Sequence, residues 1–416
     1  MNAYCKIYMH WNNIQEGFVM DFSQKAKSIS PSATLAIDSK AKKMKAEGIN
    51  VIGFGAGEPD FDTPEHIKEA AIKAIRDGFT KYTPASGTLE LKEAVCRKLS
   101  RDNGLEYKAS QIVISNGAKH SLLNAFQAVL NPGDEVILPV PYWVSYPEMI
   151  KLADGKIVYM ETTEEDGFKF TPKQLLEKIT ARSKILILNS PSNPTGMIYS
   201  KEELVKIAEI AVDKGLIVIS DEIYEELIYD GLKHTSIASL GEKIKEQTII
   251  VNGMSKAYAM TGWRIGYTAS SQEIAVIMSN VQSHATSNPN SIAQKASVTA
   301  LDGGKEDIEM MRNEYMKRRN YMVERINSIP YISCIKPQGA FYVMMNVSTL
   351  IGKVFKEAII KNADSFAEFL LEDAKVAVVP GSGFGIEGYV RLSYATSMEN
   401  ITEGLNRIEK FIKEIK

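Results

Sequence analysis

Between about residues 65 and 300, short β-branched runs alternate with segments of helical periodicity. Such alternation predicts a mainly parallel β-sheet whose connecting helices cover both of its faces. Runs such as KILIL and LIVIS are apolar throughout, as expected of strands that are buried on both faces. The predicted strands are Ile112–Ser115, Glu135–Leu138, Ile157–Met160, Ile185–Leu188, Ile217–Ser220, Thr248–Val251 and Arg264–Thr268. The predicted helices between them include Leu89–Arg101, Ser121–Leu130 and Glu202–Lys214.

The C-terminal part has a different order of elements, which predicts a separate, smaller α+β domain. Its expected elements are a long helix at Lys305–Ile329, a strand at Phe341–Met345, a helix at Ser365–Asp373, strands at Val376–Val379 and Val390–Tyr394, and a helix at Met398–Ile415. We therefore predict an α/β fold with four parts: an extension at 1–20, a segment at 21–64 that packs on the small domain, a large cofactor-binding domain at 65–305 and a small domain at 306–416. The polar, unpatterned extension is expected to be disordered or to precede the true start at Met20.

Composition excludes several classes of protein. Hydrophobic residues make up 44% and charged residues 24% of the chain, which is incompatible with intrinsic disorder. The 49 basic and 51 acidic residues give a net charge of −2, so we expect no nucleic-acid partner. Three widely spaced cysteines predict neither a metal site nor a disulfide framework, in keeping with a cytoplasmic protein. No uncharged apolar stretch reaches about 18 residues, so no membrane span is expected.

Polar side chains gather directly after the predicted strands, where active sites of open α/β sheets form. Four consecutive strand ends carry them: Asn116-Gly117-Ala118-Lys119, Asn189 to Gly196, Asp221 with Glu222 and Tyr224, and Asn252 to Lys256. The set combines a small-residue helix start, an amide, a carboxylate with a phenol, and a Ser-Lys pair. We expect these groups to meet around one ligand.

The chemistry of these groups points to a ligand with a phosphate, a carbonyl and a ring nitrogen. A helix that begins at Gly117 and Ala118 offers free N–H groups to a phosphate, and Ser255 and Arg264 could add further donors. A desolvated lysine such as Lys256 can form a Schiff base with a carbonyl. A buried carboxylate such as Asp221 can hold a ring nitrogen protonated. Together these requirements describe pyridoxal 5'-phosphate.

The string SKAYAMTGWRIGY (255–267) closely resembles the cofactor-attachment motif of the class I/II aminotransferases, which have fold type I. Further blocks resemble that family in the same order: GEPDFDTP (57–64), KYTPASGTLELKEA (81–94), PYWVSYPEM (141–149), SPSNPTG (190–196), SDEIYEELIYDG (220–231) and RLSYATS (391–397). The resemblance covers residues 21–416. Among the branches of the family, the blocks are most similar to the bacterial aspartate aminotransferase type.

This resemblance implies a role for each cofactor-facing residue. Lys256 is the implied Schiff-base lysine, which also moves a proton as general base and acid. Asp221 is the implied partner of the ring nitrogen, although a helix N-cap is another reading of such an aspartate. Tyr224 and Asn193 are the implied partners of the phenolic oxygen of the ring. Trp143 is implied to stack on the ring and to touch the substrate.

The substrate and a second subunit are implied to use four more residues. Arg391, which is flanked by apolar residues in a predicted strand, would grip the α-carboxylate of the substrate. Gly57 would let the backbone approach the substrate, although a simple glycine turn is another reading. Tyr82 matches a tyrosine that reaches the cofactor phosphate of the neighbouring subunit, so the resemblance implies a homodimer with shared active sites. Lys119 is the candidate for binding a second carboxylate, or it contributes only its backbone N–H to the phosphate.

Substrate choice rests on the segment before the first block. By resemblance, Ser32 and Thr34 help Lys119 to bind the side-chain carboxylate. Some relatives carry a lysine just before the PSAT segment and also accept prephenate. This chain has Ser30 at that position, which argues against prephenate as a substrate.

The resemblance implies an aminotransferase that converts L-aspartate and 2-oxoglutarate to oxaloacetate and L-glutamate, so its expected partners are small molecules, namely amino acids and 2-oxo acids. An aromatic or other amino-acid aminotransferase, or a β-lyase of the same fold, is the alternative. The same domain also occurs as the sensor of transcription regulators, but those need a DNA-binding domain of about 60–70 residues, which the stretch before Met20 cannot supply. A G-x-G-x-x-G match at 383–388 is expected to lead into a strand rather than a helix, so no dinucleotide site is predicted there.

Overall fold

The computed structural model describes residues 21–31 and 33–416 of the chain, so the expectations for residues 1–20 lie outside it. Its largest element is a seven-stranded sheet with the strand order β2-β8-β7-β6-β5-β3-β4. The strands are β2 (Ile112–Ser115), β3 (Glu135–Val140), β4 (Lys156–Glu161), β5 (Ser183–Asn189), β6 (Ile217–Asp221), β7 (Thr248–Gly253) and β8 (Gly266–Ala269). All seven predicted strands are present, with ends that shift by up to two residues.

The sheet is parallel except at β8, which pairs antiparallel with both β2 and β7. The predicted mainly parallel sheet is therefore confirmed. The prediction that this strand begins at Arg264 is wrong. Arg264 has a left-handed backbone (φ 55°) at the end of the short helix η3 (Thr261–Trp263), and its guanidinium donates to the carbonyl oxygen of Thr261 at 2.9 Å.

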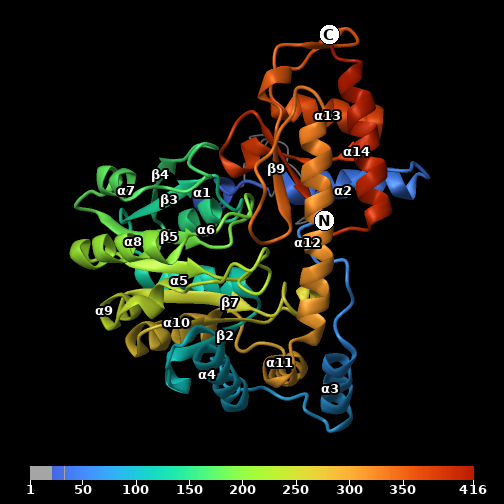
Figure 1. The fold of residues 1–416 in the computed structure, drawn as a ribbon. Coiled ribbons are helices and arrows are strands. Elements are labelled where there is room, and N and C mark those ends of the chain that lie inside the picture. The colour runs from blue at the N-terminus through green and yellow to red at the C-terminus, as the bar shows by residue number, and fades with distance from the viewer. Residues whose placement is uncertain (1–20, 32) are drawn as a thin grey trace, which may run out of the picture.

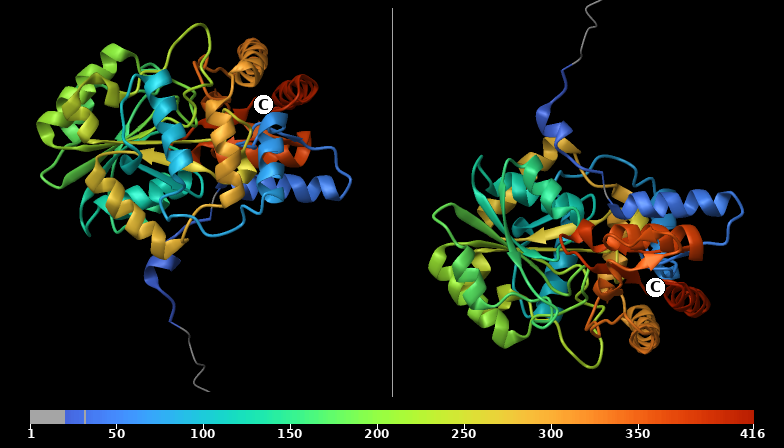
Figure 2. Two further views of the ribbon diagram at one scale, coloured as in Figure 1. Left: turned by 90° about the horizontal axis from the view of Figure 1, so that it is seen from below. Right: turned by 90° about the horizontal axis from the view of Figure 1, so that it is seen from above.

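Helices cover both faces of this sheet (Figures 1 and 2). Alternating strand residues explain the two layers, since Val113 packs on one side while Ile112 and Ile114 pack on the other. One face is covered by α5 (Ala118–Val129), α6 (Tyr146–Leu152) and α10 (Gln272–Ala285). The other face is covered by α4 (Leu89–Asn103), α7 (Pro172–Lys178), α8 (Lys201–Lys214), α9 (Glu242–Glu246) and α11 (Ser291–Asp302).

A smaller antiparallel sheet with the order β13-β14-β9 forms the second part of the fold. Its strands are β9 (Tyr342–Asn346), β13 (Val379–Pro380) and β14 (Tyr389–Ser393), and its helices are α12 (Glu306–Ser328), α13 (Ala363–Ala374) and α14 (Met398–Lys413). The predicted strand at Val376–Val379 is split in two, because β12 (Val376–Ala377) pairs with β1 (Ile52–Gly53) while β13 pairs with β14. A hairpin of β10 (Val354–Phe355) and β11 (Ala358–Ile359) completes this part. The glycine-rich segment at 383–388 leads into β14, as predicted.

The N-terminal segment touches both parts of the molecule. The short α1 (Gln24–Lys27) lies against α6, where Lys25 forms an ion pair with Asp154 at 2.7 Å. Helix α2 (Ala33–Ala46) packs on β12 and β13, and α3 (Glu65–Arg76) packs on α11. Helix α12 runs past both sheets (Figure 1), with Ile308 in the core of the large part and Tyr315 in that of the small part.

Short 3₁₀ turns occupy several connections: η1 (Ala109–Gln111), η2 (Ile237–Leu240), η4 (Ser348–Leu350) and η5 (Gly381–Phe384). None of the helices in the described ranges is long and apolar enough to cross a bilayer.

Candidate active site

A cavity of about 420 Å³ opens at the carboxyl ends of the central strands. Parallel strands place their following loops at one edge of the sheet, so residues far apart in sequence meet there. Its lining includes Gly57, Ala118, Lys119, Trp143, Asn193, Asp221, Tyr224, Ser255, Lys256, Arg264 and Arg391 from the predicted set, and Lys42, Glu58, Tyr146, Thr261 and Tyr342 in addition. The structure thus brings together most of the predicted site residues in one cavity.

Lys256 supplies an amine with altered basicity. It follows β7, and its Nζ donates a hydrogen bond to the carbonyl oxygen of Gly57 at 2.5 Å. Burial lowers the pKa of Lys256 to about 8, with the nearby cations Arg391 and Arg264 acting in the same direction against the carboxylate of Glu58. A sizeable neutral fraction near pH 8 makes this amine a competent nucleophile and base.

Asp221 is the last residue of β6 and is only 4% exposed. Burial raises the pKa of Asp221 to about 6, although hydrogen bonds oppose the shift. Those bonds come from the hydroxyl of Tyr146 to Oδ2 at 2.7 Å and from the backbone N–H of Ile223 to Oδ1 at 3.3 Å. A carboxylate in this state favours a cationic N–H group of a ligand as its partner.

The start of α5 forms an anion cradle. Its N-cap, Gly117, has φ 87°, and a Cβ at this position would overlap the guanidinium of Arg264. The close packing of Arg264 on position 117 therefore requires glycine there. It also keeps the Arg264 cation beside the free N–H groups of the first helical turn. Ala118 and Ser255 line the cavity next to that cation, whereas Gly117 lies behind the lining.

Arg391 is 2% exposed and sits in the middle of β14. Its Nη1 donates to Oδ1 of Asn193 at 2.9 Å and its Nη2 donates to the carbonyl oxygen of Gly55 at 3.0 Å. Its Nε is buried without a hydrogen-bond partner among the described residues. The guanidinium lies 4.3 Å from the ring centroid of Tyr342, and its partners are all neutral groups. A buried cation without a counter-charge is suited to a carboxylate ligand.

Aromatic side chains shape the remaining walls. The hydroxyls of Tyr224 and Tyr342 lie 2.9 Å apart, and burial raises the pKa of Tyr224 well above its usual value. Trp143 meets Tyr146 edge to face, with ring centroids 5.4 Å apart. Lys119 Nζ lies 5.1 Å from the ring centroid of Trp143, and burial, aided by a neighbouring arginine, lowers the pKa of Lys119.

Three more of the predicted residues lie apart from the cavity or outside the described part of the chain. Tyr82 is 89% exposed and does not line the cavity of its own chain. Thr34 belongs to α2, but its side chain lies outside the described part, as does Ser32.

Sequence reasoning missed Tyr146, although it stands in the same quoted block as Trp143, three positions later. Tyr342 was missed too, because nothing in its strand distinguishes a cavity-facing tyrosine from a core residue.

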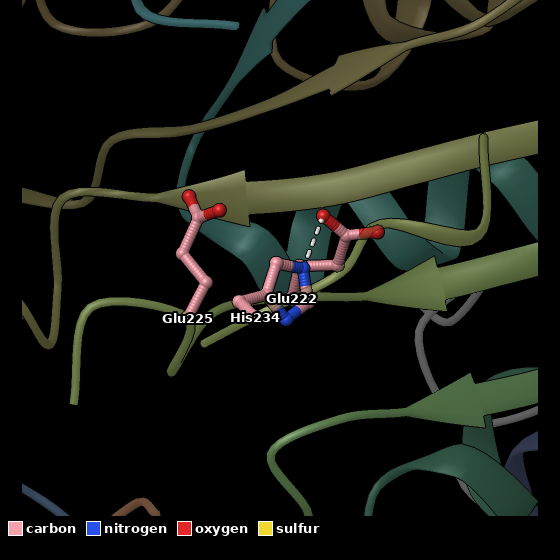
Figure 3. A group of neighbouring side chains, drawn as sticks. All are labelled: Glu222, Glu225 and His234. Atoms are coloured by element: carbon pink, nitrogen blue, oxygen red, sulfur yellow. Dashed lines mark hydrogen bonds and ion pairs between the residues drawn. The ribbon is translucent and has the colours of Figure 1, made fainter. Parts of the chain in front are cut away.

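A second buried polar cluster lies next to the cavity and consists of Glu222, Glu225 and His234 (Figure 3). Their potential ligand atoms all lie within 4.8 Å of one another. However, Glu222 already accepts from Ser236 at 2.7 Å and bonds with His234 at 3.0 Å. Glu225 pairs with the buried Lys98. The carboxylates are thus satisfied by protein donors, as in a structural ion-pair cluster.

Comparison with known proteins agrees with this geometry. The family model for "Aminotransferase class I and II" matches residues 49–408. An aspartate aminotransferase of Bacillus subtilis is 49% identical over 95% of this chain and 100% of its own length. An aspartate/prephenate aminotransferase of Nitrosomonas europaea is 46% identical over 94% of this chain and 100% of its own length. The crystal structure of the aspartate aminotransferase from Rhizobium meliloti superposes with a TM-score of 0.93 at 43% identity, covering 96% of this chain and all of that one.

A fold and a site of this kind define an enzyme that handles amino and oxo groups. The chain belongs to the class I and II aminotransferases, a family that depends on pyridoxal phosphate. The fold class and the family resemblance predicted from the sequence are therefore confirmed.

The residues of the cavity fit this cofactor. An anion cradle, a buried carboxylate and an amine of lowered pKa line a single cavity, and these are the donors that a phosphate, a ring nitrogen and an aldehyde require. The cavity volume lies within the range of small-molecule sites, about 300–1,000 Å³.

Proposed function

We propose that this protein is a pyridoxal-phosphate-dependent aspartate aminotransferase that acts in the cytoplasm. It would transfer the amino group of L-aspartate to 2-oxoglutarate, giving oxaloacetate and L-glutamate. The observation that carries the proposal is the shared cavity of Lys256, Asp221 and Arg391, which combines a nucleophile, an acid and a carboxylate receptor. The aspartate aminotransferase at 49% identity supports the choice of substrate.

Bound pyridoxal phosphate supplies an aldehyde carbon that condenses with amines and a ring that takes up electrons released at the substrate Cα. The start of α5, Ser255 and Arg264 would hold its phosphate, and Asp221 would bind its ring nitrogen. Tyr224 and Asn193 line the same cavity and would bind the phenolic oxygen.

Lys256 moves the proton in this proposal. Its neutral amine would accept the proton from the substrate Cα as general base and would give it back as general acid. Burial favours the neutral amine that this first step needs, because the pKa of Lys256 is lowered to about 8.

Arg391 and Lys119 would each bind one of the two carboxylates of the substrate. The unpartnered Nε and the neutral surroundings of Arg391 fit the α-carboxylate that every amino acid carries. Lys119, which lies over Trp143, would bind the second carboxylate of aspartate, with Thr34 as a helper. Gly57 and Trp143 complete the substrate wall.

A stopped-flow half-reaction tests the proposal. Holoenzyme is mixed with aspartate, alanine or phenylalanine, and the loss of the visible cofactor band is followed. Aspartate should react at least about tenfold faster than the others per unit concentration, because an unpaired buried cation costs a few kcal/mol. Lys119→Ala should slow aspartate selectively, and an equal loss for alanine would refute the role of Lys119. Equal rates for all three amino acids would refute aspartate specificity.

The name of the relative from Nitrosomonas europaea, an aspartate/prephenate aminotransferase, raises prephenate as a second candidate substrate. Ser30 stands where prephenate-accepting relatives carry a lysine, and its backbone N–H donates to Glu148 at 3.0 Å. We therefore expect prephenate to react poorly. Ser30→Lys should raise its rate, with the aspartate rate as the internal control.

A homodimer with shared sites is the proposed assembly. Tyr82 projects from the surface with 89% of its area exposed, so its side chain is accessible to a second chain. In the dimer it would reach the cofactor phosphate of the neighbouring subunit. Mixed dimers of Tyr82→Phe and Lys256→Ala subunits should differ in activity from the average of the two parents; strict averaging would contradict a shared site.

A further inference from the structure

The inference concerns Tyr146, the first residue of α6, which none of the proposed catalytic roles uses. It is 1% exposed, and its hydroxyl donates to Oδ2 of Asp221 at 2.7 Å. Its ring meets the ring of Trp143 edge to face, with an interplanar angle of 88°. One side chain thus contacts both the acid and the aromatic wall of the cavity.

Among the described residues, the hydroxyl is the one side-chain donor to the carboxylate of Asp221. The other hydrogen-bond donor to this carboxylate is the backbone N–H of Ile223, at the longer distance of 3.3 Å. Burial raises the pKa of Tyr146 well above 10, so the phenol remains protonated and remains a donor at any physiological pH. A fixed donor stabilises the charged form of its acceptor.

Asp221 needs such a donor because its surroundings disfavour charge. Burial is the largest influence on the pKa of Asp221 and raises it, and the adjacent Glu222 acts in the same direction. The Tyr146 hydrogen bond is the largest influence that opposes burial. Because the bond occupies Oδ2, it also fixes the rotation of the carboxylate in the cavity wall.

We propose that Tyr146 is a positioning residue that keeps Asp221 ionised and oriented toward the ring nitrogen of the cofactor, while its ring braces Trp143. The inference rests on the proposed function, in which Asp221 serves that nitrogen. Tyr146 reaches the cofactor only through Asp221 and Trp143.

The test is Tyr146→Phe, which keeps the ring beside Trp143 and removes only the hydroxyl. Tyr142→Phe is the matched control, because its ring stacks on Tyr159 and its hydroxyl does not touch Asp221. Tyr146→Phe should lower kcat with aspartate by about 10- to 100-fold, as for a lost hydrogen bond to a charged group, with little change in KM. Tyr142→Phe should leave kcat near the wild-type value.

Two readouts separate positioning from structural support. In the holoenzyme, the pH midpoint of the visible band should rise in Tyr146→Phe, because a less cationic ring leaves the attached nitrogen more basic. In the cofactor-free protein, the pH dependence of urea unfolding should place the titration of Asp221 above its wild-type midpoint near 6. Both shifts should vanish when Tyr146→Phe is made in an Asp221→Asn background.

Each outcome decides the inference. Unchanged pH midpoints and unchanged kcat would overturn it, and so would a loss of stability alone. A wild-type protein that shows no visible band with the cofactor contradicts the proposed function instead. Should the phenylalanine variant fold poorly, 3-fluorotyrosine at position 146 serves as a stronger donor and should shift both midpoints in the opposite direction.

Discussion

Two buried polar regions lie side by side around the end of β6, and they treat charge in opposite ways. In the cavity, Lys256 and Arg391 bond to carbonyl and amide oxygens and have no ion pair among the described residues. In the neighbouring cluster, Lys98 pairs with Glu225, and His234 pairs with Glu222. The adjacent residues Asp221 and Glu222 belong one to each region.

The difference separates residues that bind a ligand from residues that maintain the fold. Where buried charges already have partners, removing one partner destabilises the fold. Such charges are not available to bind a ligand. Buried charges without partners cost stability and are retained where a ligand completes them. We expect substitutions in the cavity to impair catalysis, and substitutions in the cluster to impair folding.

The largest expected effect comes from Lys256→Met. With the amine gone, no group remains to carry the proton, and kcat should fall by about 10⁴-fold or more. The free energy of unfolding should stay the same or rise, because the lost ammonium was desolvated and had no ion pair among the described residues. Steady-state kinetics and urea denaturation of the cofactor-free protein measure the two effects, and a large loss of stability would contradict the comparison.

The same substitution in the cluster, Lys98→Met, should give the reverse result. Among the described residues it leaves Glu225 buried with the amides of Asn103 and Asn252 as its hydrogen-bond donors, at 2.7 Å and 2.5 Å, and with His234 nearby. The free energy of unfolding should fall by about 3–5 kcal/mol, while the folded fraction keeps its kcat. Adding Glu225→Leu should recover part of the stability, and no recovery would show that packing rather than charge was lost.

The two buried arginines Arg391 and Arg319 give a second test of the comparison between the cavity and paired buried charges. Arg391→Lys should lower kcat/KM for aspartate, alanine and phenylalanine alike by roughly 30-fold or more, because all three share the α-carboxylate. This factor corresponds to about 2 kcal/mol. Arg319 is equally buried but is paired with Asp230 through two hydrogen bonds of 2.9 Å and 2.8 Å. Arg319→Lys should reduce stability and leave kcat/KM unchanged. A selective loss for aspartate in the Arg391 variant would reassign that residue to the side-chain carboxylate.

The smallest expected effect is a pH dependence of stability in the cluster. Burial opposes the charge on His234, but the neighbouring Glu222 and Glu225 carboxylates outweigh burial and Lys98, and they raise the pKa of His234. The imidazolium therefore adds stability that is fully present below the unfolded pKa of about 6.5 and is lost as pH rises through the higher folded value. His234→Gln should flatten this part of the curve of unfolding free energy against pH. An unchanged curve would show that His234 is neutral when folded.

The sequence predicted the sheet well because strand runs and strand ends are local patterns. Asp221 ends its strand, and Asn193 and Lys256 come a few residues after theirs, so knowledge of the strands was enough to bring them to one edge. The split between β12 and β13 was missed because both halves read as one apolar run, and only the choice of pairing partners divides it.

Other features depend on contacts that local patterns do not encode. Arg264 was placed in a strand because its neighbours are apolar, whereas its packing against Gly117 imposes a left-handed turn. The contact that distinguishes Tyr146 is the one between its hydroxyl and Asp221, which is far away in the sequence. The proposed partner of Tyr82 belongs to a second chain, so a single chain leaves that residue on the surface.

The hydrogen bond from Arg391 to the carbonyl oxygen of Gly55 joins positions 336 residues apart. During translation, the large sheet and its lysine therefore emerge long before the arginine that completes the substrate pocket. A nascent chain that has passed Lys256 but not Arg391 lacks the receptor for the α-carboxylate, so it would turn over amino acids poorly even with cofactor bound. Ribosomes stalled at successive lengths would reveal this order of maturation.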